Sequence, residues 1–160
     1  MTGAAVIYEA ALCCILLVIS AIDIRDMKIY NRHIALMSAA GIAARIITDT
    51  AQWQFAIAAS AFWGMAGAMV LLLIRILSKG GLGGGDVKLG LAIGIWLGSP
   101  DILIVLIASF IAAGAFGSIL VLLKGRRALH QKIPFGPFLS AGTMLYETGL
   151  LGIMTLGGVL

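Results

Sequence analysis

Residues 80–89 read GGLGGGDVKL, and this stretch divides an otherwise almost continuously apolar chain. Its glycines lead directly to a carboxylate, Asp86, at the start of an apolar segment. A second acid, Asp23, stands at the end of the first apolar segment. An ionisable residue in a membrane protein is costly unless it faces water, a partner or a substrate, and so indicates a functional site. The interpretation of the chain therefore depends on whether these two acids meet.

The composition indicates a polytopic membrane protein. Of 160 residues, 61% are hydrophobic and only 11% are charged, and the mean hydropathy is +1.10. A soluble domain of this size would leave much of that apolar surface in water. The first apolar segment has no basic region before it, so we expect a retained helix rather than a cleaved signal peptide. The positive charge fits membrane topology, and no nucleic-acid partner is expected.

The apolar segments predict an all-α fold with six transmembrane helices. They cover residues 4–22, 34–48, 55–77, 87–97, 102–123 and 138–160. About 20 residues are needed to cross about 30 Å of hydrocarbon, so the second segment is marginal and the fourth is short. The short segment is expected either to start below the membrane surface or to sit in a locally thinned, protein-lined region. It begins directly after Asp86, so we expect this acid to lie deeper than a surface loop.

The charges alternate between successive connections. Ten of the eleven Lys and Arg residues fall on one side of the predicted membrane, with Arg45 as the exception. The opposite connections hold Asp49 and Asp101. The positive-inside rule then places the basic connections in the cytoplasm and both termini outside. Asp23 and Asp86 are predicted to lie together on the cytoplasmic side.

Two neighbouring carboxylates suit acid–base chemistry. They cannot both ionise easily, so one keeps a proton while the other acts as a base. Such a pair can activate water for attack on a peptide carbonyl and protonate the leaving amine. The two cysteines are adjacent and the two histidines lie in basic connections, so neither a metal site nor Ser/His or Cys/His catalysis is expected.

Three motifs carry a family resemblance. Residues 23–31, DIRDMKIYN, resemble the Asp-x-Arg-x-x-x-Ile-Pro-Asn signature of type IV prepilin peptidases. Residues 83–89, GGGDVKL, resemble their Gly-x-Gly-Asp-x-Lys-Leu signature. Residues 133–138, IPFGPF, resemble the Pro-Phe-Gly-Pro segment that opens their last helix. One departure is Tyr30, which stands where the family usually has Pro and should alter the turn more than the chemistry.

The resemblance implies a membrane aspartic endopeptidase of a prokaryotic plasma membrane. It implies removal of the basic leader from type IV prepilins or pseudopilins at the cytoplasmic face, after a glycine and just before the pilin's apolar helix, without a cofactor. Carried over by position, Asp23 and Asp86 are the catalytic pair. The residues expected to support the pair or bind substrate are Gly83, Gly84, Gly85, Lys88, Asp26, Pro134 and Gly136. Lys88 is expected either to lower the pKa of Asp86, to hold substrate, or to anchor the interface.

Longer relatives carry an N-terminal cytoplasmic domain with paired Cys-x-x-Cys motifs and also methylate the product. This sequence shows neither feature. We therefore expect a single membrane-embedded peptidase domain over residues 1–160, without a zinc or methyltransferase domain. It resembles the short members that serve tight-adherence (Flp-type) pili.

Three other interpretations remain open from the sequence. A small transporter or channel uses paired acids to relay protons or bind a cation. A presenilin-like protease shares the Gly-x-Gly-Asp motif but typically has a Tyr-Asp pair, whereas Ile22 precedes Asp23 here. A non-catalytic helical assembly factor accounts for the hydrophobicity but not for the two acids.

Overall fold

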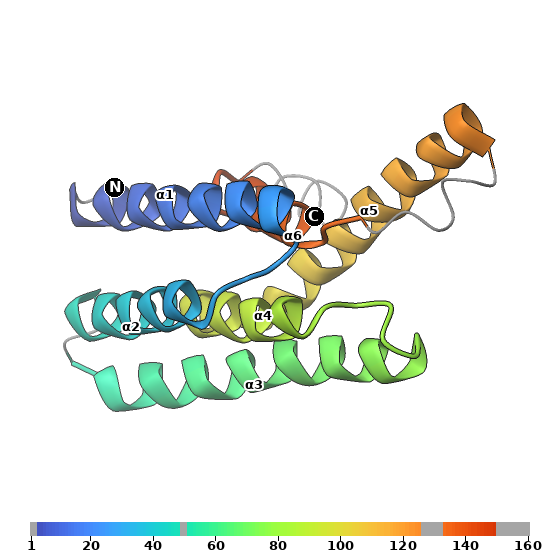
Figure 1. The fold of residues 1–160 in the computed structure, drawn as a ribbon. Helices are drawn as coiled ribbons and strands as arrows, with labels where there is room; N and C mark the ends of the chain where they lie inside the picture. Colours follow the sequence, from blue (N-terminus) through green and yellow to red (C-terminus); the bar gives the residue numbers. More distant parts are fainter. Residues whose placement is uncertain (1–2, 49–50, 126–132, 150–160) are drawn as a thin grey trace, which may run out of the picture.

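The computed structural model of the chain describes residues 3–48, 51–125 and 133–149. All regular secondary structure in these ranges is helical, which confirms the predicted all-α class (Figure 1). The helices are α1 (Gly3–Asp26), α2 (Asn31–Thr48), α3 (Trp53–Leu77), α4 (Gly84–Leu97), α5 (Ile102–Lys124) and α6 (Gly136–Glu147).

The helices follow the predicted apolar segments, with shifted ends. α1 continues through Asp23, and α4 begins early enough to place Asp86 in its first turn. Residues 150–160 of the sixth predicted segment lie outside the described residues. Within the described ranges, α3 and α5 are long and apolar enough to cross a membrane. Six spans and the side on which the termini lie stay a prediction.

Helix α4 lies at the centre of the fold. It contacts α2, α3, α5 and α6, and from Leu89 onward it is apolar on every face, as expected of a buried helix. Its side chains Leu89, Ile93 and Trp96 are almost completely buried. With 14 residues it is about 21 Å long, so the prediction of a short fourth helix is confirmed.

Glycines allow α3 and α4 to approach closely. A Cβ atom at Gly94 would lie 2.5 Å from the carbonyl oxygen of Trp63 and 2.7 Å from Cα of Gly64. One turn earlier on α4, Gly90 faces Gly67, where a Cβ would lie 3.1 Å from the Gly90 carbonyl oxygen. Paired small residues are a common way to bring helices together in membranes.

The same contacts fix the register of these two antiparallel helices. Gly84, the first residue of α4, lies against the Arg75 guanidinium in the last turn of α3. At the other end, a Cβ at Gly98 would lie 3.0 Å from Oγ of Ser60, well inside α3. The acid end of α4 is therefore level with the end of α3. At the other end, α4 stops while α3 continues past it, so α4 is shorter than α3 at that end.

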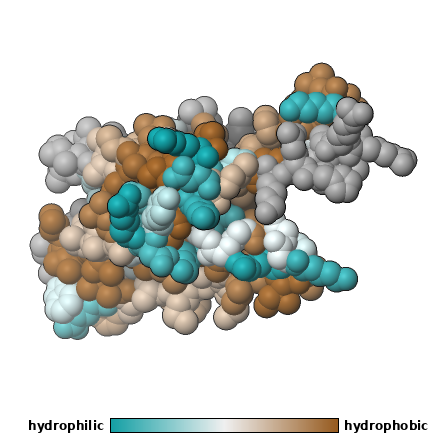
Figure 2. Space-filling model, in the orientation of Figure 1, coloured by the Kyte–Doolittle hydropathy of each residue, from teal (hydrophilic) through white to brown (hydrophobic). Residues whose placement is uncertain are grey.

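Large apolar side chains cover the outside of the bundle. Phe55, Leu77, Leu122 and Leu123 are each at least 73% exposed. Figure 2 shows hydrophobic residues over the sides of the helices and hydrophilic residues gathered around the end of α1 and its connection to α2. A contiguous apolar exterior of this kind indicates contact with lipid or protein.

Candidate active site

The end of α1 and the beginnings of α2 and α4 surround a cavity of about 400 Å³. Its lining consists of Asp23, residues 27–31 and residues 83–86. The structure thus brings Asp23 and Asp86 to the same cavity, although they are far apart in the sequence. The acids come from two helices that face each other across the bundle (Figure 1).

Asp23 lies in the last turn of α1 and is only 5% exposed. The helix ends because Met27 adopts a left-handed conformation, with φ of 52°, and donates its N–H to the Asp23 carbonyl at 3.0 Å. The carboxylate oxygen Oδ2 accepts the N–H of Gly136, the first residue of α6, at 3.0 Å. A helix N-terminus favours a negative charge, so the α6 contact favours the ionised form of Asp23 and opposes the effect of burial.

Asp86 lies in the first turn of α4 and is 7% exposed. Its Oδ2 accepts the N–H of Gly83, the residue that caps α4, at 3.0 Å. A Cβ at Gly83 would lie 2.8 Å from that oxygen. The glycine is therefore needed for the carboxylate to reach back to the backbone, and this requirement explains part of the glycine run.

The two acids differ in electrostatics, and both lie just outside the apolar segments 4–22 and 87–97. Burial, and then the negative charge of Asp23, raise the pKa of Asp86 to about 6, against the lowering effects of the Gly83 bond and Arg75. Burial raises the pKa of Asp23, and the Gly136 bond opposes that rise. Asp86 is thus the member of the pair that holds its proton more strongly.

The other predicted site residues differ in whether they line the cavity. Gly83, Gly84 and Gly85 line the cavity with the acids. Lys88 does not: its Nζ donates to Oδ1 of Asn31 at 2.8 Å on the exposed surface, which ties α4 to α2. Among the expected roles for Lys88, the charge effect on Asp86 belongs instead to Arg75.

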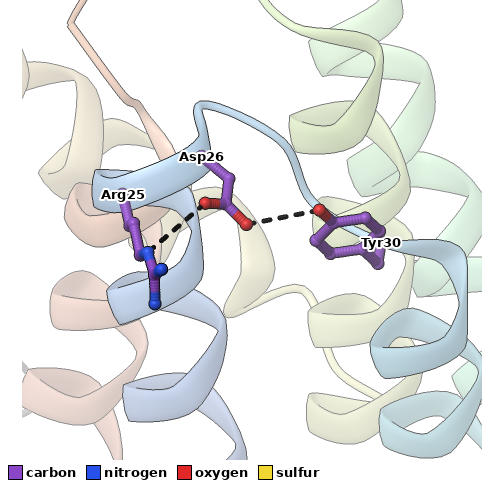
Figure 3. A network of polar contacts seen from close by, with 3 residues as sticks. All are labelled: Arg25, Asp26 and Tyr30. Carbon is purple, nitrogen blue, oxygen red and sulfur yellow. Dashed lines mark hydrogen bonds and ion pairs between the residues drawn. The ribbon is translucent and has the colours of Figure 1, made fainter.

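Asp26 is exposed and faces the connection to α2 (Figure 3). Its Oδ2 accepts the hydroxyl of Tyr30 at 3.2 Å, and its Oδ1 lies 3.8 Å from Nε of Arg25. The Tyr30 carbonyl in turn accepts the N–H of His33 at 3.1 Å in the first turn of α2. The hydroxyl bond therefore restrains the turn at the position where the family usually has Pro.

Pro134 is half-buried and precedes Phe135, the residue before α6. It does not line the cavity, whereas Gly136 contacts Asp23 directly. Reasoning from the sequence did not identify Arg75 or residues 27–31 as part of the site, although residues 27–31 line the cavity. The signal for Arg75 was its place in the last turn of the helix that leads into the glycine run.

Among the residues that the structure describes, no three His, Cys, Asp or Glu side chains form a group that can hold a metal ion. The cavity brings together two carboxylates, and the pKa of Asp86 is raised to about 6 by burial and by the charge of Asp23. Together with the helical fold, this defines a class of protein with a buried acid pair at one end of a helical bundle.

Residues 10–118 match the type IV leader peptidase family, and the chain belongs to this family. The family resemblance seen in the sequence is thereby confirmed. The chain is 33% identical over 131 residues to a prepilin leader peptidase/N-methyltransferase of Bacillus subtilis, covering 82% of this chain and 51% of that protein. It is 32% identical over 136 residues to the protein of the same name from Burkholderia pseudomallei, covering 82% and 42%.

A shorter relative is leader peptidase HopD of Salmonella typhimurium, 43% identical over 63 residues, which cover 39% of this chain and 40% of HopD. The chain spans about half the length of the first two relatives. No solved structure matches the chain at a significant level.

Proposed function

We propose that the chain is a membrane aspartic endopeptidase that removes the basic leader from type IV prepilin-like precursors. Family membership and the names of the relatives support leader-peptide cleavage. The observation that carries the catalytic assignment is the single cavity onto which both Asp23 and Asp86 open. Each carboxylate is held by a backbone N–H at 3.0 Å.

The electrostatics suggest the role of each acid. Ionised Asp23 takes a proton from a water molecule while the water oxygen bonds to the carbonyl carbon of the scissile peptide. Neutral Asp86 donates a hydrogen bond to the carbonyl oxygen, which develops negative charge. The carbon–nitrogen bond then breaks as the amine receives a proton from the pair. The products are a carboxylate on the leader and a free amine on the mature protein.

The same proposal includes the membrane arrangement. Six helices cross the plasma membrane, the basic connections face the cytoplasm, and the acid pair meets the leader there. The apolar exterior of α3 and α5 supports contact with lipid. The partner is a precursor with a basic leader followed by an apolar helix, and neither nucleic acid nor a cofactor takes part.

The test compares Asp23→Asn and Asp86→Asn with Asp26→Asn, a matched change of an exposed acid on the same helix as Asp23. Purified variants in liposomes are given a precursor, and cleavage is followed by mass spectrometry. We expect the first two variants to lose activity by about a thousandfold or more, with Asp26→Asn close to the unmodified protein. A chelator should have no effect. Full activity in either Asn variant of the pair would refute the mechanism.

A further inference from the structure

A second cavity, of about 370 Å³, lies beside the acid site. Its walls are the end of α3, the connection before α4, the middle of α5 and the segment that opens α6. The side chains that shape it include Ile74, Leu82, Phe110, Ile133, Phe135 and Phe138. We refer to it as the apolar groove.

Two residues in the wall of the apolar groove directly precede the glycines that hold the two acids. Leu82 in its wall directly precedes Gly83, whose N–H holds Asp86. Phe135 in its wall directly precedes Gly136, whose N–H holds Asp23. Each acid is therefore hydrogen-bonded to a glycine whose preceding residue lies in the wall of the groove. A peptide bond placed between the acids has the groove next to it.

The two cavities differ sharply in chemistry. The acid cavity contains both carboxylates, Lys28 and Asn31, whereas the groove contains no charged side chain. Phe110 and Phe135 pack with ring centroids 4.7 Å apart along one wall. Ser78 is polar, but its hydroxyl is already bonded to the Arg75 carbonyl at 3.2 Å. A chain that lies across both cavities therefore meets charged and polar side chains in the first and mainly apolar side chains in the second.

We propose that the apolar groove binds the first apolar side chains of the mature segment, directly after the scissile bond. This inference rests on the proposed function, because a prepilin-like precursor changes from a polar leader to an apolar helix at its cleavage point. The complementary polarity of the two cavities and their continuity with the acids single out this occupant. Two other occupants, a lipid acyl chain and residues 150–160 of this chain, are tested below.

Gly114 gives a direct test of the groove. It lies in the wall on α5, and a Cβ placed there meets no atom within 4 Å. Gly114→Leu should therefore fill the groove without displacing the protein. The matched control is Ala115→Leu, the next residue on α5, which is exposed and outside the groove.

Two precursors separate binding from chemistry, one with Phe and one with Ala at the first positions of the mature segment. With Gly114→Leu we expect kcat/KM for the Phe precursor to fall by about tenfold or more, chiefly through KM. The Ala precursor should be much less affected, and Ala115→Leu should cleave both like the unmodified protein. Equal cleavage of the Phe precursor by both variants, or an equal loss on both precursors, overturns the proposal.

Photocrosslinking identifies the occupant. A benzoylphenylalanine replaces Ile74 in the groove or Ile111 on the exposed side of α5, in the Asp23→Asn background, so that the precursor stays intact. Crosslinks from position 74 to the mature segment, absent from position 111, support the proposal. Crosslinks to lipid or to residues 150–160 alone, or none to the precursor, contradict it. If Asp23→Asn still cleaves, the proposed function fails instead, so the two failures are distinguishable.

Discussion

A single methyl group added at Gly136 should displace the Asp23 carboxylate. A Cβ on this residue would lie 2.6 Å from Oδ2 of Asp23 and 3.1 Å from its Cγ. Cβ atoms essentially never come closer than 3.0 Å to another atom, so the carboxylate must withdraw by at least about 0.4 Å. Gly136 is buried at the first position of α6, where the backbone has little room to move instead.

The cost of Gly136→Ala follows from the bond that the methyl group disrupts. Asp23 accepts the Gly136 N–H at 3.0 Å, and a hydrogen bond to a charged group contributes about 1.5–3 kcal/mol. At about 1.4 kcal/mol per factor of ten, kcat/KM for a precursor should fall by about 10- to 150-fold. The bond also lowers the pKa of Asp23, so its loss should move the acidic limb of the pH–activity profile to higher pH.

The matched control is Gly117→Ala on α5, which lines neither cavity and where the nearest neighbour of a Cβ lies 3.8 Å away. Within a helix this change should stabilise by roughly 0.5–1 kcal/mol and leave activity close to that of the unmodified protein. Both variants are assayed in liposomes across the pH range, with thermal unfolding to confirm that each is folded. A Gly136→Ala protein with unchanged kcat/KM and an unshifted profile would refute the reasoning.

Three further predictions concern stability and are measured by thermal unfolding in detergent. The pKa of Asp86 is raised from 3.8 to about 6, so the folded state loses stability as the pH rises through that window. Asp86→Asn should therefore melt at a higher temperature than the unmodified protein at pH 8 and at the same temperature at pH 4. A difference in melting temperature that does not change with pH would contradict this. Gly94→Ala should destabilise by about 1–3 kcal/mol, because its methyl group pushes α3 from α4, whereas Gly117→Ala, with its nearest neighbour 3.8 Å away, should not. Arg45→Leu removes the guanidinium bonds to the carbonyl oxygens of Trp96 and Leu97 and should cost about 1.5–3 kcal/mol, with Arg45→Lys in between; an unchanged melting temperature for Arg45→Leu would show that these bonds contribute nothing.

The helices were predictable because the chain separates apolar from polar residues cleanly. The apolar segments end at or near charges or glycines, and the observed helices follow those segments with shifted ends. The site was predictable in outline for the same reason, since Asp23 and Asp86 end and begin two segments predicted to share one face. Their placement on one cavity agrees with that prediction.

The supporting contacts were not predictable, because they depend on side-chain direction. Asp26 is three residues from Asp23, yet it does not line the cavity, and its carboxylate accepts the hydroxyl of Tyr30 instead. Lys88 is two residues from Asp86, yet it reaches Asn31. Spacing along the sequence gives no information on a rotamer that is set by the facing helix.

The exceptional position of Arg45 follows from the length of α4. This helix ends at Leu97, and the following Gly98 lies beside Ser60, seven residues into α3. The end of α4 therefore lies about 10 Å short of the start of α3. The carbonyl groups at a helix end have no partner within the helix, and in hydrocarbon each unpaired group is costly.

Arg45 donates to the carbonyls of Trp96 and Leu97, and the Tyr8 hydroxyl donates to the carbonyl of Trp96 at 3.1 Å. A positive charge at a helix C-terminus also opposes the negative end of its dipole. The one basic residue that departs from the positive-inside pattern therefore satisfies the buried end of the helix that carries Asp86. Counting it as a topology signal would mistake a helix cap for a surface charge.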